Sequence, residues 1–174
     1  MQKIELVLSD IDGVWTDGGL YFTAETEYMK RFSVYDGWGV RYCRNLGIPV
    51  GIITAEEIPM AQLVALKFKT PHIHMGVKDK LATARQLCDS LGVSLEHTAY
   101  IGDDLNDLPL LEQVGFSACP SSAPKWVRDR VDHVCATPGG YGAFREFVEH
   151  ILADHPDFPQ LIETYAKHGR FPGS

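Results

Sequence analysis

The feature that most constrains the fold is a recurring apolar run that ends in a polar residue. Such runs occupy residues 4–10 (IELVLSD), 48–54 (IPVGIIT) and 97–103 (HTAYIGD). Short runs rich in Ile and Val are typical of strands that are buried on both faces. Segments with helical spacing, at 79–91 and 141–152, alternate with the runs. This alternation predicts an α/β fold in which helices flank a mostly parallel sheet.

Three further runs extend the predicted sheet, at 72–77 (HIHMGV), 115–120 (GFSACP) and 132–137 (DHVCAT). Between the first strand and the first helix, two alternating segments flank a polar stretch, which predicts a β-hairpin at about 18–34. Every other connection is short, so we expect one domain over residues 1–153. The segment 154–174 is expected to be a peripheral tail or a segment used in assembly.

Composition and charge exclude several classes of function. The net charge of −7 disfavours nucleic acid as a partner, because a nucleic-acid surface needs clustered Lys and Arg. No apolar run approaches the roughly 20 residues of a membrane span, and the N-terminus does not resemble a signal peptide. We therefore expect a cytoplasmic protein without a membrane partner. The widely spaced cysteines are expected to be reduced packing residues rather than zinc ligands or disulfides: Cys43, Cys88, Cys119 and Cys135.

The carboxyl ends of the predicted strands carry a consistent set of polar residues. Asp10 and Asp12 follow the first run, Thr54 ends the second, and Asp103 ends the run at 97–103. Lys80 lies in a connection between strands. Because ligands bind at the carboxyl edge of an open parallel sheet, these side chains are expected to converge there.

The expected cluster has the chemistry of phosphoryl transfer. Grouped carboxylates destabilise one another unless a cation neutralises them, and hard oxygen ligands favour Mg²⁺. Lys80 offers a positive charge and Thr54 a hydroxyl to the oxygens of a phosphate. Asp12 could protonate a leaving oxygen and later activate water.

The motifs that carry these residues resemble those of the haloacid dehalogenase superfamily of phosphatases. They are DIDGVWTD (10–17), the Thr of GIIT (51–54), the Lys of VKDKL (77–81) and YIGDDLND (100–107). The short chain, the hairpin in place of a cap domain and GGYGAFRE (139–146) resemble the capless phosphatases of 3-deoxy-2-ketosugar acid phosphates. The resemblance extends over about residues 4–150.

The resemblance implies a Rossmann-like fold and a specific set of roles. Asp10 would be the nucleophile, which forms a transient phosphoryl ester, and Asp12 the acid and base. Mg²⁺ would be held by the Asp10 side chain, the Asp12 carbonyl oxygen and Asp103. Thr54 and Lys80 would bind the phosphate. Members of this family are also similar in forming homotetramers, in which neighbouring subunits cover the active sites.

Four residues could each have either of two roles. Asn106 could contact the leaving-group side of the substrate or cap a helix. Arg145 could bind a substrate carboxylate or form a surface salt bridge. Asp104 and Asp107 could support either the metal or Lys80.

The resemblance leaves two substrates open. One is 3-deoxy-D-manno-octulosonate (KDO) 8-phosphate. The other is the nine-carbon KDN 9-phosphate, because Trp15, Gly18 and Gly19 look more like the phosphatases of nine-carbon sugars. Glu56 and Glu57 follow the Thr54 motif and make the approach of a carboxylate-bearing sugar less direct.

Two alternatives to this function remain open, and the first belongs to another functional class. Capless domains of this kind also occur as catalytically idle oligomerisation or regulatory modules, but the intact acidic residues favour an enzyme. The other alternative is a phosphatase of a different small phosphate ester, or of nucleic-acid ends. The acidic charge disfavours nucleic-acid ends as the substrate.

Overall fold

The structure is a computed structural model that describes residues 3–25, 27–57 and 59–171. Its centre is a six-stranded sheet in the order β5–β4–β1–β6–β7–β8, and each pair of neighbours runs parallel. The strands are β1 (Leu6–Ser9), β4 (Val50–Ile53), β5 (His72–His74), β6 (Thr98–Ile101), β7 (Phe116–Cys119) and β8 (His133–Val134). The parallel α/β architecture expected from the sequence is confirmed, with strands shorter than the apolar runs.

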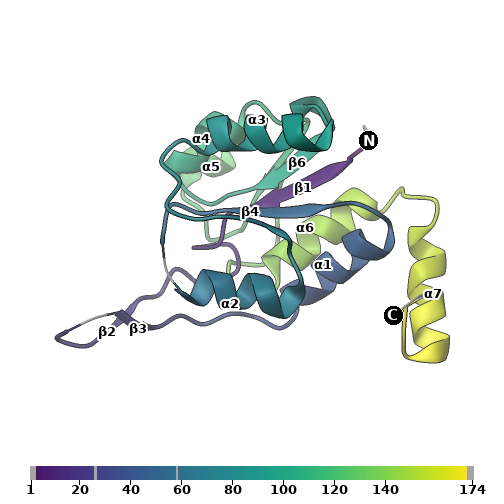
Figure 1. Ribbon diagram of the computed structural model, residues 1–174, viewed down its shortest axis with the longest axis horizontal. Coiled ribbons are helices and arrows are strands. Elements are labelled where there is room, and N and C mark those ends of the chain that lie inside the picture. Colours follow the sequence, from purple (N-terminus) through teal and green to yellow (C-terminus); the bar gives the residue numbers. More distant parts are fainter. Residues whose placement is uncertain (1–2, 26, 58, 172–174) are drawn as a thin grey trace.

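Both faces of the sheet are buried, which explains why the strands read as continuous apolar runs. Alternate residues of β1 enter different core clusters: Val7 packs on one face, and Leu6 and Leu8 pack on the other. Figure 1 shows the resulting three layers, with helices above and below the sheet.

The helices that cover the Val7 face are α1 (Asp36–Asn45), α2 (Pro59–Phe68) and α6 (Ala143–Leu152). Those that cover the opposite face are α3 (Lys80–Leu91), α4 (Leu108–Leu111) and α5 (Lys125–Arg128). Helix α3 begins sharply because the Asp79 carboxylate accepts a hydrogen bond from the Ala82 N–H. It ends at Gly92, which adopts φ 67°. The cap at Asp79 fixes Lys80 as the first residue of the helix.

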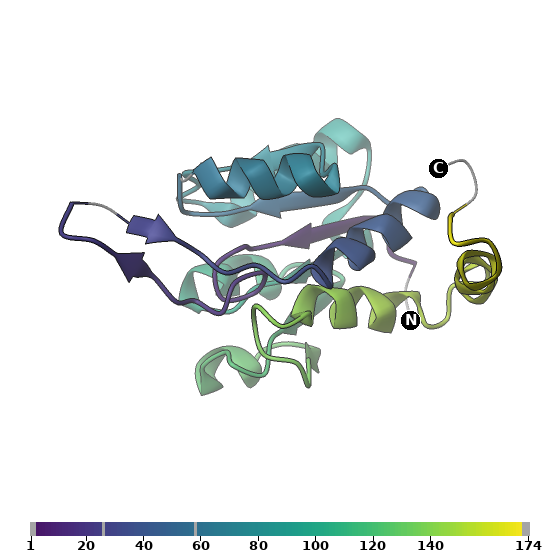
Figure 2. The same cartoon turned by 90° about the horizontal axis from the view of Figure 1, so that it is seen from below.

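The hairpin expected at about 18–34 is present as β2 (Tyr21–Phe22) and β3 (Glu27–Met29), which pair antiparallel. Figure 2 shows that it projects from the body of the molecule as a narrow arm. Both views show the arm at the end of the sheet where β1 and β4 finish.

The C-terminal segment forms α7 (Phe158–His168), at the opposite end of the molecule from the hairpin. Its Tyr165 ring packs edge-on against Trp38 of α1 at a centroid distance of 4.9 Å. Leu161 and Phe171 are buried in the same core cluster as α1 and α6. These side chains therefore attach the tail to the core, while most of α7 lies at the surface, and a role in assembly stays a prediction. Among the described residues, no helix is both long and apolar enough to cross a membrane.

Candidate active site

The aspartates at the ends of β1 and β6 converge at the carboxyl edge of the sheet. One carboxylate oxygen from each of Asp10, Asp103 and Asp107 lies within 4.8 Å of the others. The backbone N–H of Asp10 donates to the carbonyl oxygen of Ile101 over 3.0 Å, which continues the β1–β6 ladder. The two strands therefore deliver Asp10 and Asp103 to the same place.

The turn after Asp10 requires a glycine. Gly13 has φ +79°, which L side chains rarely adopt, and a Cβ at this position would lie 1.8 Å from Oδ2 of Asp103. Only a residue without a side chain allows the β1 loop to approach Asp103 so closely. The glycine of the DIDG motif thus brings two carboxylate-bearing loops together.

Lys80 lies between two of the carboxylates and is almost completely buried. Its Nζ is 3.0 Å from Oδ2 of Asp10 and 2.6 Å from Oδ1 of Asp107. Burial disfavours its charge, but the two carboxylates outweigh that effect and raise the pKa of Lys80 above its usual value. Lys80 therefore supplies a permanent positive charge beside Asp10.

Asp107 is fully buried and organises the groups around it. Its Oδ1 accepts hydrogen bonds from Lys80 and from the Tyr100 hydroxyl, the latter at 2.5 Å. Its Oδ2 accepts the N–H groups of Asp103 and Asp104 at 2.9 and 3.1 Å. A carboxylate has about four acceptor positions, so these bonds saturate it. Asp107 thus fixes Lys80 and the Asp103 loop rather than binding a ligand itself.

Asp12 has a partner that sequence reasoning did not identify. Lys30, at the base of the hairpin, places Nζ 2.8 Å from Oδ1 of Asp12, and its side chain is only 1% exposed. The Thr16 hydroxyl lies 3.4 Å from the same oxygen and accepts the N–H of Gly13. These contacts orient Asp12 from two sides.

The electrostatics of the cluster are those of a site built for a cation. Burial is the main reason why the pKa of Asp10 rises to about 7, with a further contribution from Asp107. Burial also raises the pKa of Asp103 to about 8, reinforced by the charges of Asp10 and Asp107. In the absence of a cation, both carboxyl groups therefore resist ionisation near neutral pH.

The polar atoms left without partners test whether a metal fits here. Among the described residues, Oδ1 of Asp10 and Oδ2 of Asp12 are buried and have no hydrogen-bond partner. Such atoms are costly unless a ligand satisfies them. The carboxylates of Asp10 and Asp103, which lie close together, supply hard oxygen donors of the kind that Mg²⁺ prefers. The residues present therefore fit a magnesium ion.

The remaining predicted residues occupy different surroundings. Thr54 is buried at the end of β4, and its hydroxyl oxygen accepts the N–H of Glu56 at 3.2 Å, which leaves the hydroxyl proton for a ligand. Asn106 is exposed in a single 3₁₀ turn, Leu105–Asp107. Arg145 donates to Glu149 at 2.7 Å and lies over the Tyr42 ring, so it is paired on α6. The ligand-binding roles of these three residues remain predictions.

Comparison with known proteins relates this arrangement to a family. Residues 72–142 match the family of haloacid dehalogenase-like hydrolases. The chain is 37% identical over 152 residues to the 3-deoxy-D-manno-octulosonate 8-phosphate phosphatase KdsC of Haemophilus influenzae, covering 87% of this chain and 84% of that protein. It is 34% identical over 151 residues to KdsC of Escherichia coli K12, with coverage of 87% and 80%.

Solved structures give the same result. The 3-deoxy-D-manno-octulosonate 8-phosphate phosphatase of Moraxella catarrhalis, in complex with magnesium, phosphate and KDO, matches with a TM-score of 0.88 at 36% identity. That match covers 93% of each chain. The cobalt-bound Haemophilus influenzae phosphatase matches with a TM-score of 0.83 at 37% identity, over 87% of this chain and 88% of that one.

A parallel sheet with aspartates after β1 and β6, and with a lysine at the start of α3, defines an enzyme of the haloacid dehalogenase-like hydrolase class. Within that class, the chain belongs to the phosphatase family that includes the KdsC proteins.

Proposed function

We propose that this chain is a magnesium-dependent phosphomonoesterase that hydrolyses KDO 8-phosphate through a phosphoryl ester on Asp10. The observation that carries the proposal is the placement of Asp10, whose Oδ2 is held by Lys80 while its Oδ1 has no partner among the described residues. The names of the relatives support KDO 8-phosphate over KDN 9-phosphate.

In the first step, one carboxylate oxygen of Asp10 attacks phosphorus. A bond forms between this oxygen and phosphorus, and the bond between phosphorus and the sugar oxygen breaks. Asp12 gives its proton to the departing oxygen, which leaves as the sugar hydroxyl. Lys80 orients the attacking carboxylate and favours its ionised form, and a bound cation would add to that effect.

In the second step, water attacks the phosphorus of the ester. Asp12 takes one proton from that water, the bond between phosphorus and Asp10 breaks, and inorganic phosphate leaves. Asp10 returns as a free carboxylate and Asp12 is protonated again, so both residues are ready for the next turnover.

The phosphate requires neutralising charge and hydrogen bonds while it reacts. In our proposal, Thr54 and Lys80 contact the phosphate oxygens. Mg²⁺ would be held by the Asp10 side chain, the Asp12 carbonyl oxygen and Asp103. The ion would offset the negative charge of the phosphate and the carboxylates. Asn106 and Arg145 are weaker candidates for contacts with the sugar acid. For Arg145, such a contact would require its ion pair with Glu149 to open.

We also propose that the enzyme is a homotetramer in which the hairpin meets neighbouring subunits. The arm exposes a group of large apolar side chains: Leu20, Tyr21, Phe22 and Met29. Such a group on a narrow projection is typical of an interface. Light scattering of the native protein and of Phe22→Glu tests this proposal, since the variant is expected to dissociate.

The substrate is tested by Mg²⁺-dependent phosphate release from KDO 8-phosphate, KDN 9-phosphate and a simple hexose phosphate. We expect the highest kcat/KM with KDO 8-phosphate and little release from the hexose phosphate. A preference for KDN 9-phosphate would change the substrate but keep the mechanism. Absence of release from all three compounds, with Mg²⁺ present, would overturn the proposed function.

A further inference from the structure

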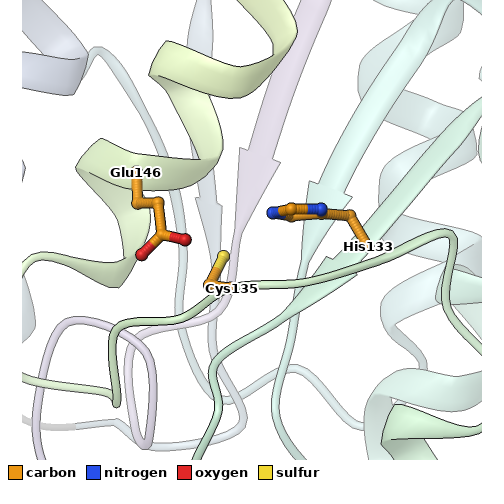
Figure 3. Close-up of side chains that lie close together, drawn as sticks. All are labelled: His133, Cys135 and Glu146. Carbon is orange, nitrogen blue, oxygen red and sulfur yellow. The ribbon is translucent and has the colours of Figure 1, made fainter.

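A second group of metal-binding side chains lies outside the active site, where β8 leads toward α6. His133 is in β8, Cys135 follows that strand, and Glu146 is on the first turn of α6. One donor atom from each lies within 4.8 Å of the others. Figure 3 shows the imidazole, the thiol and the carboxylate pointing toward a common centre.

The positions of these side chains are set by the fold. His133 and Cys135 are two residues apart, and the N–H of Cys135 donates to the carbonyl oxygen of Cys119 at 2.8 Å, which fixes the chain beyond β8 against β7. Glu146 reaches back from the helix, so its two oxygens accept the N–H groups of Ala136 and Thr137 at 2.7 and 2.8 Å. Three donors from two separate segments are thus held at one place.

Each side chain is available as a ligand. The backbone N–H groups of Ala136 and Thr137 and the side chain of Thr137 use three of the about four acceptor positions of Glu146 and fix the carboxylate, which leaves one position for a ligand. Burial lowers the pKa of His133, so its imidazole is neutral and can donate a lone pair. Among the described residues, the buried thiol of Cys135 has one long contact, 3.8 Å, to the carbonyl oxygen of Ala143. Burial raises the pKa of this thiol to about 12, so zinc would have to displace its proton on binding.

The donor set indicates which metal would bind. Sulfur and imidazole nitrogen are ligands that zinc prefers, whereas magnesium prefers oxygen ligands. The donor set therefore favours zinc over magnesium. Tetrahedral zinc has bonds of about 2.0–2.3 Å, which separate its ligand atoms by about 3.3–3.8 Å. The three donors lie within 4.8 Å of one another, so they would have to approach by up to about 1 Å to reach that geometry. Solvent can complete the coordination at the partly exposed edge formed by His133 and Glu146.

We propose that His133, Cys135 and Glu146 form a Zn²⁺ site with three protein ligands, which joins the end of β8 to α6. On binding, a bond forms between zinc and the Cys135 sulfur, and the thiol proton is released to solvent. The sequence shows no zinc motif around the widely spaced cysteines and therefore predicts a packing role for Cys135. The other two ligands, His133 and Glu146, join it only in the folded chain.

The loop that follows the proposed zinc site packs against the active-site turn. The loop that follows Cys135 contains Gly139 and Gly140, and the N–H of Gly140 donates to the carbonyl oxygen of Val14 at 2.9 Å. A Cβ on Gly139 would lie 1.8 Å from the carbonyl oxygen of Gly13. Zinc would therefore brace a loop that packs directly on the turn that carries Asp10 and Asp12.

The test titrates Co²⁺, a spectroscopic substitute for Zn²⁺, into metal-stripped protein in the presence of excess Mg²⁺. Only a thiolate ligand gives the intense sulfur-to-cobalt charge-transfer absorption, so the oxygen ligands of the active site are silent. We expect one equivalent of Co²⁺ to produce this band and Zn²⁺ to displace it. The band is expected to be absent in Cys135→Ser and to require at least about tenfold more Co²⁺ in His133→Gln.

Two controls make the result specific. Cys88→Ser changes another buried cysteine to a residue that can keep its contact with Thr98, and it should leave the band unchanged. Asp10→Asn alters the active site and should also retain the band. Zn²⁺ is further expected to raise the melting temperature of the native protein, Cys88→Ser and Asp10→Asn but not of Cys135→Ser. Absence of the band from the native protein, or its persistence in folded Cys135→Ser, would overturn the proposal.

Discussion

The ammonium group of Lys30 lies 2.8 Å from Oδ1 of Asp12, although the two residues are 18 positions apart in the chain. This ion pair connects the base of the hairpin to the residue that we propose as the acid and base. The arm thus contacts the proposed acid and base within its own chain, in addition to its proposed role in assembly.

Lys30→Met is expected to lower kcat on KDO 8-phosphate by about tenfold or more, and by no more than the roughly 10²–10⁴-fold that general acid–base catalysis typically contributes. The substitution keeps an unbranched, apolar side chain only one atom shorter but removes the charge that orients Asp12. Lys30→Arg should recover part of the activity. Steady-state kinetics test this, with Lys125→Met as the control, because Lys125 is exposed and pairs only with Asp129 among the contacts of the described residues. Equal kcat in Lys30→Met and the native enzyme would contradict a positioning role.

Gly13→Ala is expected to abolish activity and to destabilise the protein. The added Cβ would collide with the Asp103 carboxylate, and the positive φ would be strained as well. Gly47→Ala is the matched control, since Gly47 has a similar φ of +74° and nothing within 4 Å of the added atom. The control should lose about 1–2 kcal/mol of stability from backbone strain and keep its kcat. Similar losses of activity in both variants would show that strain alone, and not the contact with Asp103, accounts for the effect.

Asp107→Asn is expected to be among the most destabilising single substitutions in the site, by about 3–5 kcal/mol. The amide cannot accept from Lys80, Tyr100 and two backbone N–H groups together, so Lys80 loses one of its two anionic partners. Tyr100→Phe removes one of these hydrogen bonds and should cost about 1–3 kcal/mol. Chemical denaturation of both variants with Mg²⁺ present measures the difference. An Asp107→Asn variant as stable as Tyr100→Phe would mean that Asp107 does not organise the cluster.

The buried carboxyl group of Asp36 is expected to make the free energy of unfolding depend on pH. It is fully buried, its Oδ1 accepts the N–H of Arg145 at 3.1 Å, and burial raises its pKa from 3.8 to about 7. Between these values the folded protein binds a proton that the unfolded chain has lost, so this residue's effect on stability becomes less favourable as the pH rises through that window. Above pH 7 both states are ionised and the loss is complete.

Asp36→Asn removes this titration. The variant is expected to gain stability relative to the native protein as the pH rises from 4 to 7, by an amount on the order of a few kcal/mol. Denaturation at pH 5 and pH 8 in saturating Mg²⁺ isolates the effect from Asp10 and Asp103. A difference between the two proteins that stays constant with pH would contradict a protonated Asp36.

The sequence predicted the parts of the site that depend on strand ends. Asp10 and Asp103 could be located because apolar runs end at a common edge of a parallel sheet, and Lys80 because it opens the helical pattern at 79–91. Lys30 and Tyr100 could not be located in this way. Lys30 contacts Asp12 only because the hairpin folds back toward the end of β1. Tyr100 has the pattern of an ordinary strand residue, and only the folded structure shows that its hydroxyl donates to Asp107. Tertiary contacts of this kind leave no periodic signal in the sequence.

The most direct test of the central claim is the identification of the residue that carries the phosphoryl group. Native enzyme is mixed with KDO 8-phosphate and Mg²⁺, quenched in acid within a single turnover and analysed by mass spectrometry, with Asp10→Asn treated in parallel. We predict a phosphorylated peptide that contains Asp10 in the native enzyme, and neither phosphorylation nor phosphate release in Asp10→Asn. Native-like turnover by Asp10→Asn, or a phosphoryl group on another residue, would contradict the account.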